Sequence, residues 1–321
     1  MILGMICVIA ALVAFVVAFL IPSSQSASNP PEKRIAVLLP QNSSKYWQQV
    51  LCGIEQETDT NMSVQITQIS QSDVEEQKLR FEMAVAAAVD GIIVQPSDDS
   101  LAEQMLEKAN AARIPVVLLG SAVPDNEHCC YVGSDHYRAG KIAAELLYES
   151  TGGNASIAII SGLENQNSQK QKIQGFQDTL EQWAQMKVMC VEHSGMDSVR
   201  AAQVVQRLLK AYPEINTFVG INPEDLEGIV KTIEPKLNKD AYYLIGFDDS
   251  EETLSGIRRG IVTASVVEEP YEMGRLAMLQ LKTIMDEERE STDRQVQTEL
   301  FAVSKDTLDQ YNQWVQESRY E

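Results

Sequence analysis

The sequence predicts an α/β protein with two doubly wound parallel-sheet lobes, preceded by an N-terminal hydrophobic helix. Apolar, β-rich runs alternate with amphipathic helical stretches from residue 35 onward, which is the pattern of a mostly parallel, doubly wound sheet. The strand starts recur roughly every 25–30 residues, about the length of one βαβ unit. Nine such runs over about 290 residues exceed what one twisted sheet holds comfortably, so two α/β lobes are predicted.

The first element is the apolar segment of residues 1–22, MILGMICVIAALVAFVVAFLIP, which contains no charged side chain. A helix of this length spans about 33 Å, enough to cross the hydrocarbon core of a bilayer. Two interpretations stay open: a transmembrane anchor, or a signal segment cut within Ser23–Ser28. Residues 23–32 form a polar linker with two prolines, and the chain after Ser28 is expected to be extracytoplasmic.

The strands are predicted at nine apolar runs, several of them near-continuous Val, Ile and Leu, which is typical of strands covered on both faces. These runs are Ile35–Leu39, Val64–Ile69, Ile92–Val94, Val116–Leu119, Ile157–Ile160, Val188–Val191, Thr217–Val219, Tyr242–Ile245 and Val262–Val267. Helices are predicted between them, because apolar residues recur at i, i+3, i+4 and i+7. The two clearest sets are Trp47, Val50, Leu51 and Ile54, and Val205, Leu208, Leu209 and Tyr212.

The composition excludes several functions. Lys and Arg number 26 against 46 Asp and Glu, and the resulting net charge of −20 argues against nucleic-acid binding. There is no GxxxxGK[ST] loop, no GxGxxG after a strand and no GxSxG elbow. The three histidines are scattered, and the run Glu127–Cys130 has no partner pair to complete a metal site. We therefore expect no metal, no cofactor and no catalytic residue.

Binding groups are better represented. Ligands of doubly wound sheets bind beyond the carboxyl ends of the strands, and polar or aromatic residues follow the apolar runs there. They are Tyr46, Trp47, Gln95, Lys172, Asn222, Asp248 and Glu268. Each has a plainer interpretation as a core aromatic or a solvated loop residue. Together, amide, ammonium, carboxylate and aromatic groups suit a polyhydroxylated ligand.

Seven pieces of sequence carry a family resemblance over residues 33–305. They are IAVLLPQNSSKYWQQVLCGIEQ, AAAVDGIIVQPSD, ANAARIPVVLL, YVGSDHYRAGKIAAELL, IAIISGLENQNSQKQKIQGF, INPEDLEG and LIGFDDSEETLSGIRRGIVTASVVEEPYEMGRLA. In this order and spacing the chain resembles the extracytoplasmic sugar-binding proteins of the ribose/galactose type, the periplasmic-binding-protein-like class I fold.

The resemblance implies that three crossover segments form a hinge between the lobes, near Ser134–Asp135, near Glu268–Glu269 and around Thr298–Val303. Lobe 1 is then expected to comprise residues 33–134 plus 269–297, and lobe 2 residues 135–268 plus 298–321.

The resemblance also implies roles at the site. Tyr46 and Trp47 occupy the positions that stack on the sugar, Ser44 stands where Asn is common, and Gln95 where Asn or Asp reaches the ligand. Lys172 takes the usual Arg position, Glu268 the usual Gln position, and Asn222 and Asp248 match polar ligand contacts. The Asp-Arg pair that often follows the fourth strand is replaced by Gly120-Ser121, which leaves Ser121 as the candidate there and leaves room for a different ligand.

The resulting prediction is a solute-binding protein that captures a sugar or sugar-like ligand for an ABC importer, without catalysis. An alternative is a membrane-anchored ligand sensor that signals to a histidine kinase or chemoreceptor. The predicted partners are thus a carbohydrate, a permease or a sensor kinase, and the membrane through the N-terminal helix. Repressors with this effector fold carry a helix-turn-helix where this chain has an apolar segment, so DNA binding is not expected.

Overall fold

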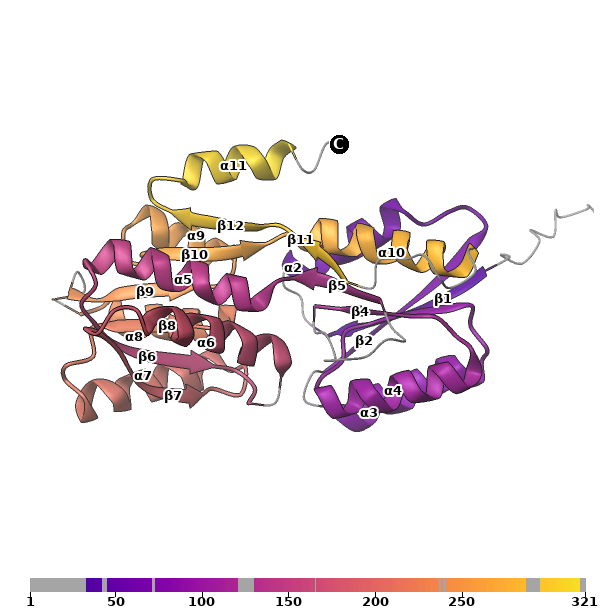
Figure 1. The fold of residues 1–321 in the computed structure, drawn as a ribbon, viewed down its shortest axis with the longest axis horizontal. Coiled ribbons are helices and arrows are strands. Elements are labelled where there is room, and N and C mark those ends of the chain that lie inside the picture. The colour runs from indigo at the N-terminus through magenta and orange to yellow at the C-terminus, as the bar shows by residue number, and fades with distance from the viewer. Residues whose placement is uncertain are drawn as a thin grey trace, which may run out of the picture.

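The computed structural model describes residues 33–41, 45–70, 73–120, 130–164, 166–236, 238, 241–286 and 295–317. Within these ranges, no helix has the length and apolar character needed to span a membrane. The predicted hydrophobic helix of residues 1–22, the linker of residues 23–32, Ser44 and Ser121 lie outside the described residues. The described chain forms two α/β lobes placed end to end along the long axis of the molecule (Figure 1).

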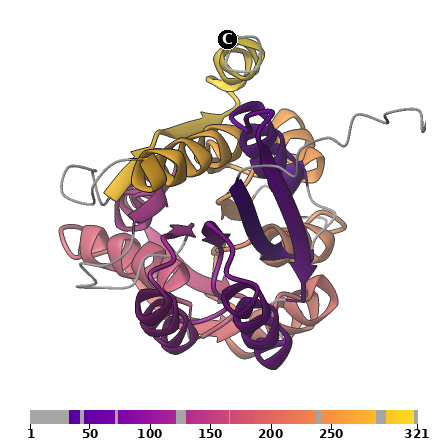
Figure 2. The same cartoon turned by 90° about the vertical axis from the view of Figure 1, so that its right-hand side faces the viewer.

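Lobe 1 is built on a six-stranded sheet with the strand order β11-β5-β4-β3-β1-β2, and all of its paired strands are parallel. Its strands are β1 (Lys33–Pro40), β2 (Met62–Ile69), β3 (Gly91–Val94), β4 (Val116–Leu119), β5 (Cys130–Ser134) and β11 (Gln295–Thr298). Its helices are α2 (Lys45–Gln56), α3 (Val74–Ala86), α4 (Asp99–Ala112) and α10 (Pro270–Asp286), which cover the two faces of the sheet (Figure 2).

Lobe 2 repeats this arrangement with the order β12-β10-β9-β8-β6-β7, in which only the β10–β12 pair is antiparallel. Its strands are β6 (Ala155–Ser161), β7 (Met186–His193), β8 (Thr217–Gly220), β9 (Tyr243–Gly246), β10 (Ala264–Glu268) and β12 (Leu300–Ser304). Its helices are α5 (His136–Thr151), α6 (Asn167–Leu180), α7 (Ser198–Ala211), α8 (Pro223–Ile233), α9 (Glu251–Arg258) and α11 (Leu308–Glu317).

The predicted fold class is therefore confirmed for the two lobes. The central strands β3 and β4 are buried along their whole length, as their unbroken apolar sequences GIIV and VVLL indicate. The helix predicted from Val205 and Leu208 forms, but Tyr212 lies at its C-terminal cap and is 42% exposed, so Tyr212 is not part of the buried face.

Three strands were not among the nine apolar runs: β5, β11 and β12. Their sequences are CYVGS, QVQT and LFAVS, which are mixed or polar. β11 and β12 are the outermost strands of their sheets, where one edge lacks a neighbouring strand and a polar residue can remain solvated.

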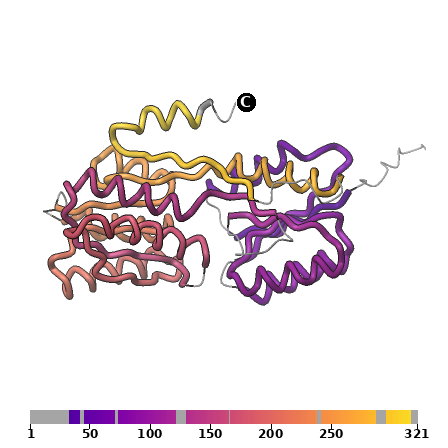
Figure 3. Tube along the Cα trace, in the orientation of Figure 1, coloured from indigo at the N-terminus to yellow at the C-terminus, as the bar shows by residue number. Residues whose placement is uncertain are grey.

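The chain passes between the lobes at three places, after β5, after β10 and between β11 and β12 (Figure 3). Two of these crossings are joined by a hydrogen bond of 2.9 Å between the buried hydroxyls of Ser134 and Thr298. The backbone N–H of Glu299 also donates to the Glu269 carboxylate at 3.0 Å. These contacts hold the crossing segments side by side where the lobes meet.

Two glycines set the distance between helices α5 and α6 in lobe 2. A Cβ atom on Gly140 would lie 2.0 Å from the carbonyl oxygen of Lys172, and one on Gly175 would lie 2.0 Å from that of Tyr137. No real Cβ sits so close to a backbone atom. The close packing of α5 on α6 therefore requires glycine, and it fixes the backbone that carries Lys172.

We predict that Gly140→Ala forces α5 and α6 apart and lowers the free energy of unfolding by about 1–3 kcal/mol, as overpacked sites do. Urea unfolding followed by circular dichroism measures this change. Lys141→Ala, an exposed substitution on the same helix, is the control and should have little effect. A Gly140→Ala protein as stable as the control would show that the helices do not depend on this contact.

Candidate functional site

A cavity of about 660 Å³ lies between the lobes and is lined by residues from both. The sheet orders place it at the switch points, beyond the carboxyl ends of β1 and β3 in lobe 1 and of β6 and β8 in lobe 2. Seven of the nine residues predicted for the site line this cavity: Tyr46, Trp47, Gln95, Lys172, Asn222, Asp248 and Glu268. Ser44 and Ser121 are outside the described residues, and their roles stay predictions.

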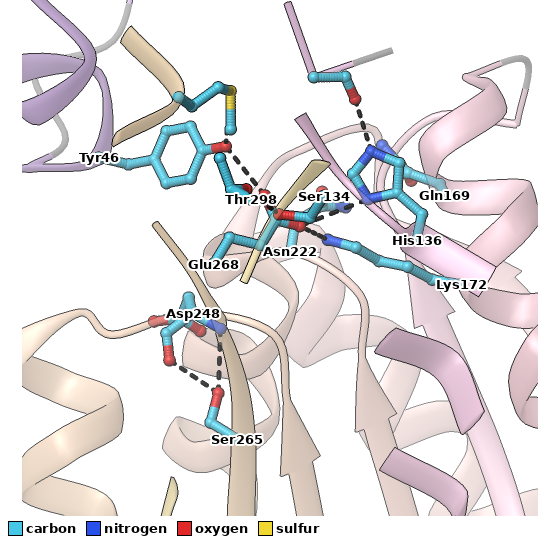
Figure 4. Close-up of polar contacts among 12 residues, drawn as sticks. Tyr46, Ser134, His136, Gln169, Lys172, Asn222, Asp248, Ser265, Glu268 and Thr298 are labelled. Atoms are coloured by element: carbon cyan, nitrogen blue, oxygen red, sulfur yellow. Dashed lines mark hydrogen bonds and ion pairs between the residues drawn. The ribbon is translucent and has the colours of Figure 1, made fainter. Parts of the chain in front are cut away.

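The most connected group in the cavity is the carboxylate of Glu268, at the end of β10 where the chain leaves lobe 2 (Figure 4). The Tyr46 hydroxyl, from helix α2 of lobe 1, donates to Glu268 Oε2 at 2.9 Å. Lys172 Nζ, from helix α6 of lobe 2, lies 2.9 Å from Oε1. One buried carboxylate thus contacts both lobes.

The electrostatics of this group follow from its burial and its neighbours. Burial raises the pKa of Glu268, but the Lys172 ammonium and the His136 ring outweigh that effect and hold the pKa well below its usual range. Burial and the adjacent Glu268 charge raise the pKa of Tyr46 well above its usual value, so its hydroxyl remains a hydrogen-bond donor. Glu268 is therefore an anion, and Tyr46 is neutral, at physiological pH.

His136 follows the crossing after β5, and its ring lies between the Gly120 carbonyl of lobe 1 and the Glu268 carboxylate. Its Nε2 lies 2.6 Å from the carbonyl oxygen of Gly120, and since a carbonyl can only accept, Nε2 carries the hydrogen. Its Nδ1 faces Glu268 Oε1 at 3.4 Å. The histidine side chain thus joins the end of β4 in lobe 1 to the Glu268 cluster.

Asp248 lies in the loop between β9 and α9 and is only 9% exposed. Its Oδ1 accepts from the Ser250 backbone N–H at 2.8 Å and from the Thr253 hydroxyl at 2.7 Å, which fastens the loop to the start of α9. Its Oδ2 is buried without a hydrogen-bond partner. Burial raises the pKa of Asp248, and the bonds from Ser250 and Thr253 counteract that rise.

Gln95, directly after β3 in lobe 1, presents a second buried acceptor. The residue is 4% exposed, and its side-chain Oε1 has no hydrogen-bond partner. Its backbone is held in place because the Gln77 side-chain amide donates to the Gln95 carbonyl oxygen at 2.8 Å. A fixed backbone with an unpartnered amide oxygen leaves that oxygen available to a bound molecule.

Asn222 has a structural role as well as a place in the cavity wall. It is the N-cap residue of α8, and its Nδ2 donates to Asp225 Oδ2 at 2.9 Å. Burial raises the pKa of Asp225 to about 6, although the hydrogen bonds from Ser194 and Asn222 act to lower it. One of the two hydrogens on the Asn222 amide nitrogen is thus used at the start of α8.

Aromatic rings form part of the cavity wall on both sides. Tyr46 and Trp47 meet edge to face, with ring centroids 5.1 Å apart, and Trp47 is 8% exposed. On the lobe 2 side, Lys172 Nζ lies 5.2 Å from the centroid of the Phe247 ring, a distance at which a cation is attracted to the ring face.

Several lining residues were not predicted from the sequence, and they include Lys45, His136, Gln166, Phe247 and Asp249. Phe247 and Asp249 flank the predicted Asp248, and Gln166 lies in a polar loop after a strand, so position alone could have indicated them. Lys45 precedes the predicted Tyr46 and His136 follows the Ser134–Asp135 crossing, so position could also have indicated these two, although not their partners, which are distant in the sequence. Among the described residues, no group of three or more His, Cys, Asp or Glu side chains could hold a metal ion.

Two parallel α/β lobes, three crossings and a polar cleft at the strand ends define a two-lobed binding protein of the periplasmic-binding-protein type. The family model described as "Periplasmic binding protein domain" matches residues 35–289, and the chain belongs to this family. Membership implies an extracytoplasmic location.

Individual proteins resemble this chain along most of its length. The ribose import binding protein of Bacillus subtilis (strain 168) is 26% identical over 225 residues, covering 70% of this chain and 72% of that protein. The glucose-galactose binding protein GanP of Geobacillus stearothermophilus superposes with a TM-score of 0.81 at 30% identity, covering 86% of this chain and 98% of that one. A sugar-binding protein of a sugar ABC transporter from Bacillus halodurans gives 0.78 at 26% identity, covering 87% and 100%. These relatives are named as binding proteins and not as enzymes.

We predict that Glu268→Gln destabilises the protein by about 3–5 kcal/mol near pH 7, because it leaves the buried Lys172 ammonium without its anion. The folded-state pKa of Glu268 lies below its unfolded value, which is about 4.3. Its contribution is thus fully present above that value and is lost as the pH falls below it. Urea unfolding between about pH 7 and pH 3.5 should show the difference from wild type shrinking with acid.

Glu214→Gln, on the exposed surface of lobe 2, is the matched control and should unfold like the wild type throughout. A Glu268→Gln deficit that stays constant or grows toward low pH would contradict the assigned ionisation.

Proposed function

We propose that this protein captures a sugar or sugar-like ligand between its lobes and delivers it to an ABC importer. The observation that carries the proposal is the cleft itself, in which aromatic rings and unpartnered buried acceptors from both lobes face one cavity. Sugars offer hydroxyl donors around an apolar C–H face, which these groups complement. The names of the relatives, which refer to ribose, to glucose and galactose, and to a sugar, support this ligand class.

The proposed mechanism is closure of two rigid lobes about the three crossings. In this proposal the lobes are those predicted from the sequence, residues 33–134 plus 269–297 and residues 135–268 plus 298–321, except that Thr298 pairs with Ser134 in the sheet of lobe 1. A ligand that touches Gln95 on lobe 1 and Asp248 on lobe 2 gains both contacts only when the lobes are together, so binding shifts the population toward the closed form. The importer then recognises the closed shape, and no bond of the ligand is changed.

Two of the contacts that already join the lobes support the proposal that the closed form differs little from the arrangement of the lobes described above. Tyr46 of lobe 1 bonds Glu268, and Lys45 of lobe 1 lies 3.2 Å from Asp249 of lobe 2. The first is buried and the second is at the half-exposed rim, where an ion pair contributes little by itself. The His136 Nε2–Gly120 oxygen contact of 2.6 Å and the Lys170–Asp99 ion pair of 3.7 Å also join the lobes. In this proposal the ligand adds its own contacts to these.

A second candidate is a ligand sensor anchored by residues 1–22 that reports occupancy to a histidine kinase or chemoreceptor. The observation that favours it is the uncharged apolar segment of residues 1–22, which as a helix would be long enough to cross a bilayer. The two candidates share the binding event and differ in the partner. Reconstitution with a permease and its ATPase, compared with a sensor kinase, separates them by whether bound sugar stimulates ATP hydrolysis or autophosphorylation.

Trp47→Ala is predicted to weaken sugar binding by about 2 kcal/mol or more, roughly thirtyfold, because a buried aromatic anchor is removed. The full chain, purified in a mild detergent, is first screened by thermal shift against pentoses and hexoses such as ribose, arabinose, allose, glucose and galactose. Isothermal titration calorimetry with a sugar that raises the melting temperature then gives the affinity of each variant.

Trp183→Ala is the matched control, since Trp183 stacks on Tyr148 with ring centroids 4.1 Å apart in lobe 2 and does not line the cleft. It should retain sugar affinity while losing some stability. Equal affinity of Trp47→Ala and wild type would remove Trp47 from the binding site. Absence of binding by every sugar in the screen and by their aminated derivatives would contradict the proposed function.

A further inference from the structure

We propose that the preferred guest of this cleft carries a positive charge, as an amino sugar or imino sugar does, and is not a neutral sugar. The inference deepens the proposed function and rests on it. It is carried by the charge of the cavity wall, by the pairing of its cations, and by two buried acceptors that have no partner.

The wall of the cavity is strongly acidic. Its described lining residues include seven carboxylates and two ammonium groups, and no arginine is among them. The carboxylates are Glu224, Glu227, Asp248, Asp249, Glu251, Glu252 and Glu268, and the ammonium groups belong to Lys45 and Lys172. A cavity lined mainly by one sign of charge concentrates ligands of the opposite sign.

Both ammonium groups are already engaged with carboxylates of the same wall. Lys172 Nζ lies 2.9 Å from Glu268 Oε1, and Lys45 Nζ lies 3.2 Å from Asp249 Oδ2. The Tyr311 hydroxyl also donates to Asp249 Oδ2, at 2.8 Å. The described lysines of the wall thus neutralise two carboxylates. Two more pair with cations outside the wall, Glu227 with Lys231 and Glu251 with Arg258. Asp248 takes part in no ion pair among the described residues, so an anionic guest would still meet like charge at the buried end of the wall.

The buried groups that lack a partner are acceptors. Asp248 Oδ2 on lobe 2 and Gln95 Oε1 on lobe 1 have no hydrogen-bond partner, and their residues are 9% and 4% exposed. A buried acceptor left unmatched is costly, so the guest must bring donors to both sides of the cleft. A hydroxyl brings one hydrogen, whereas the protonated amine of an amino sugar brings three and that of an imino sugar brings two, together with a positive charge that matches the Asp248 carboxylate.

The aromatic wall fits the same guest. The indole of Trp47 lines the cavity, and indole is the ring that attracts a cation most strongly. The Lys172 ammonium over Phe247 shows that this cleft already holds one cation against an aromatic face. A protonated amine placed between Asp248 and Trp47 would meet a carboxylate and an aromatic ring together.

A neutral sugar satisfies the acceptors without compensating the charge of Asp248. Hydrogen bonds to charged groups contribute more than those between neutral groups, and the difference corresponds to about a tenfold change in affinity. We expect an aminated sugar to bind at least about tenfold more tightly than its neutral parent.

The test compares matched pairs on the full chain in detergent by calorimetry near pH 7. The neutral arm holds glucose, galactose, mannose and allose. The charged arm holds their 2-amino, 3-amino and 6-amino derivatives and the 1-deoxy imino sugars, with N-acetylated forms as uncharged controls. The expected result is tighter binding of at least one charged member than of its neutral parent, lost on N-acetylation.

Asp248→Asn gives the second readout, because it keeps Oδ1 for Ser250 and Thr253 while removing the charge. It should reduce the preference for the amine about tenfold and change the affinity for a neutral sugar much less. Glu214→Gln, which removes a carboxylate outside the cavity, should leave the preference unchanged.

The outcomes separate the two proposals. Neutral parents that bind as tightly as every aminated derivative would overturn the charge preference and leave sugar capture intact. An amine preference that persists unchanged in Asp248→Asn would overturn the assignment to this carboxylate. If no member of either arm binds, both proposals fail.

Discussion

The arrangement of this molecule depends on one buried carboxylate, that of Glu268. It lies at the end of β10, at one of the three places where the chain crosses between the lobes, and it receives the Tyr46 hydroxyl from lobe 1 and the Lys172 ammonium from lobe 2. A carboxylate at this depth is tolerated only when its charge is matched, so each partner must be held in place. The close packing of α5 on α6 and the start of α2 after β1 supply that positioning.

The cleft follows from the same constraint. Lys172 and Lys45 are paired with Glu268 and Asp249, so neither lysine of the described cavity wall is free of a carboxylate. The buried groups left for a ligand are hydrogen-bond acceptors, Gln95 Oε1 and Asp248 Oδ2. The two lobes then differ from one another in what they offer a guest: lobe 1 contributes Trp47 and the Gln95 amide oxygen, and lobe 2 contributes Asp248. Family membership explains the two-lobed fold, whereas these particular side chains determine which ligand the cleft can bind.

Much of the fold could be predicted from the sequence, because its strongest signals are local. The strands β3 and β4 are buried on both faces and therefore read as unbroken apolar runs. β11 has the sequence QVQT at a sheet edge, where nothing demands apolar residues, and only its pairing with β5 across a long sequence separation makes it a strand. Seven of the nine predicted site residues line one cavity because chain topology brings strand ends together.

What could not be predicted is how those residues are paired. Lys172 and Glu268 were each predicted to contact a ligand, which stays a prediction, and the structure in addition pairs them with one another. Asn222 gives its amide nitrogen to Asp225, and one oxygen of Asp248 holds the start of α9. Such pairings depend on side-chain positions within a few ångströms, which no spacing in the sequence encodes. His136 entered the site for the same reason, through a carbonyl of Gly120 on the other lobe.

A double-mutant cycle of Tyr46→Phe and Lys172→Met, measured by the free energy of unfolding, tests most directly whether Glu268 couples the lobes. If it does, removing the ammonium lets the buried carboxyl take up a proton, and a bond from Tyr46 to a neutral carboxyl is weaker than one to a carboxylate, so the two effects are not additive. We predict that Tyr46→Phe costs about 1 kcal/mol less in the Lys172→Met background. Additive effects within about 0.3 kcal/mol would show that the two contacts are independent and would contradict the central role of Glu268.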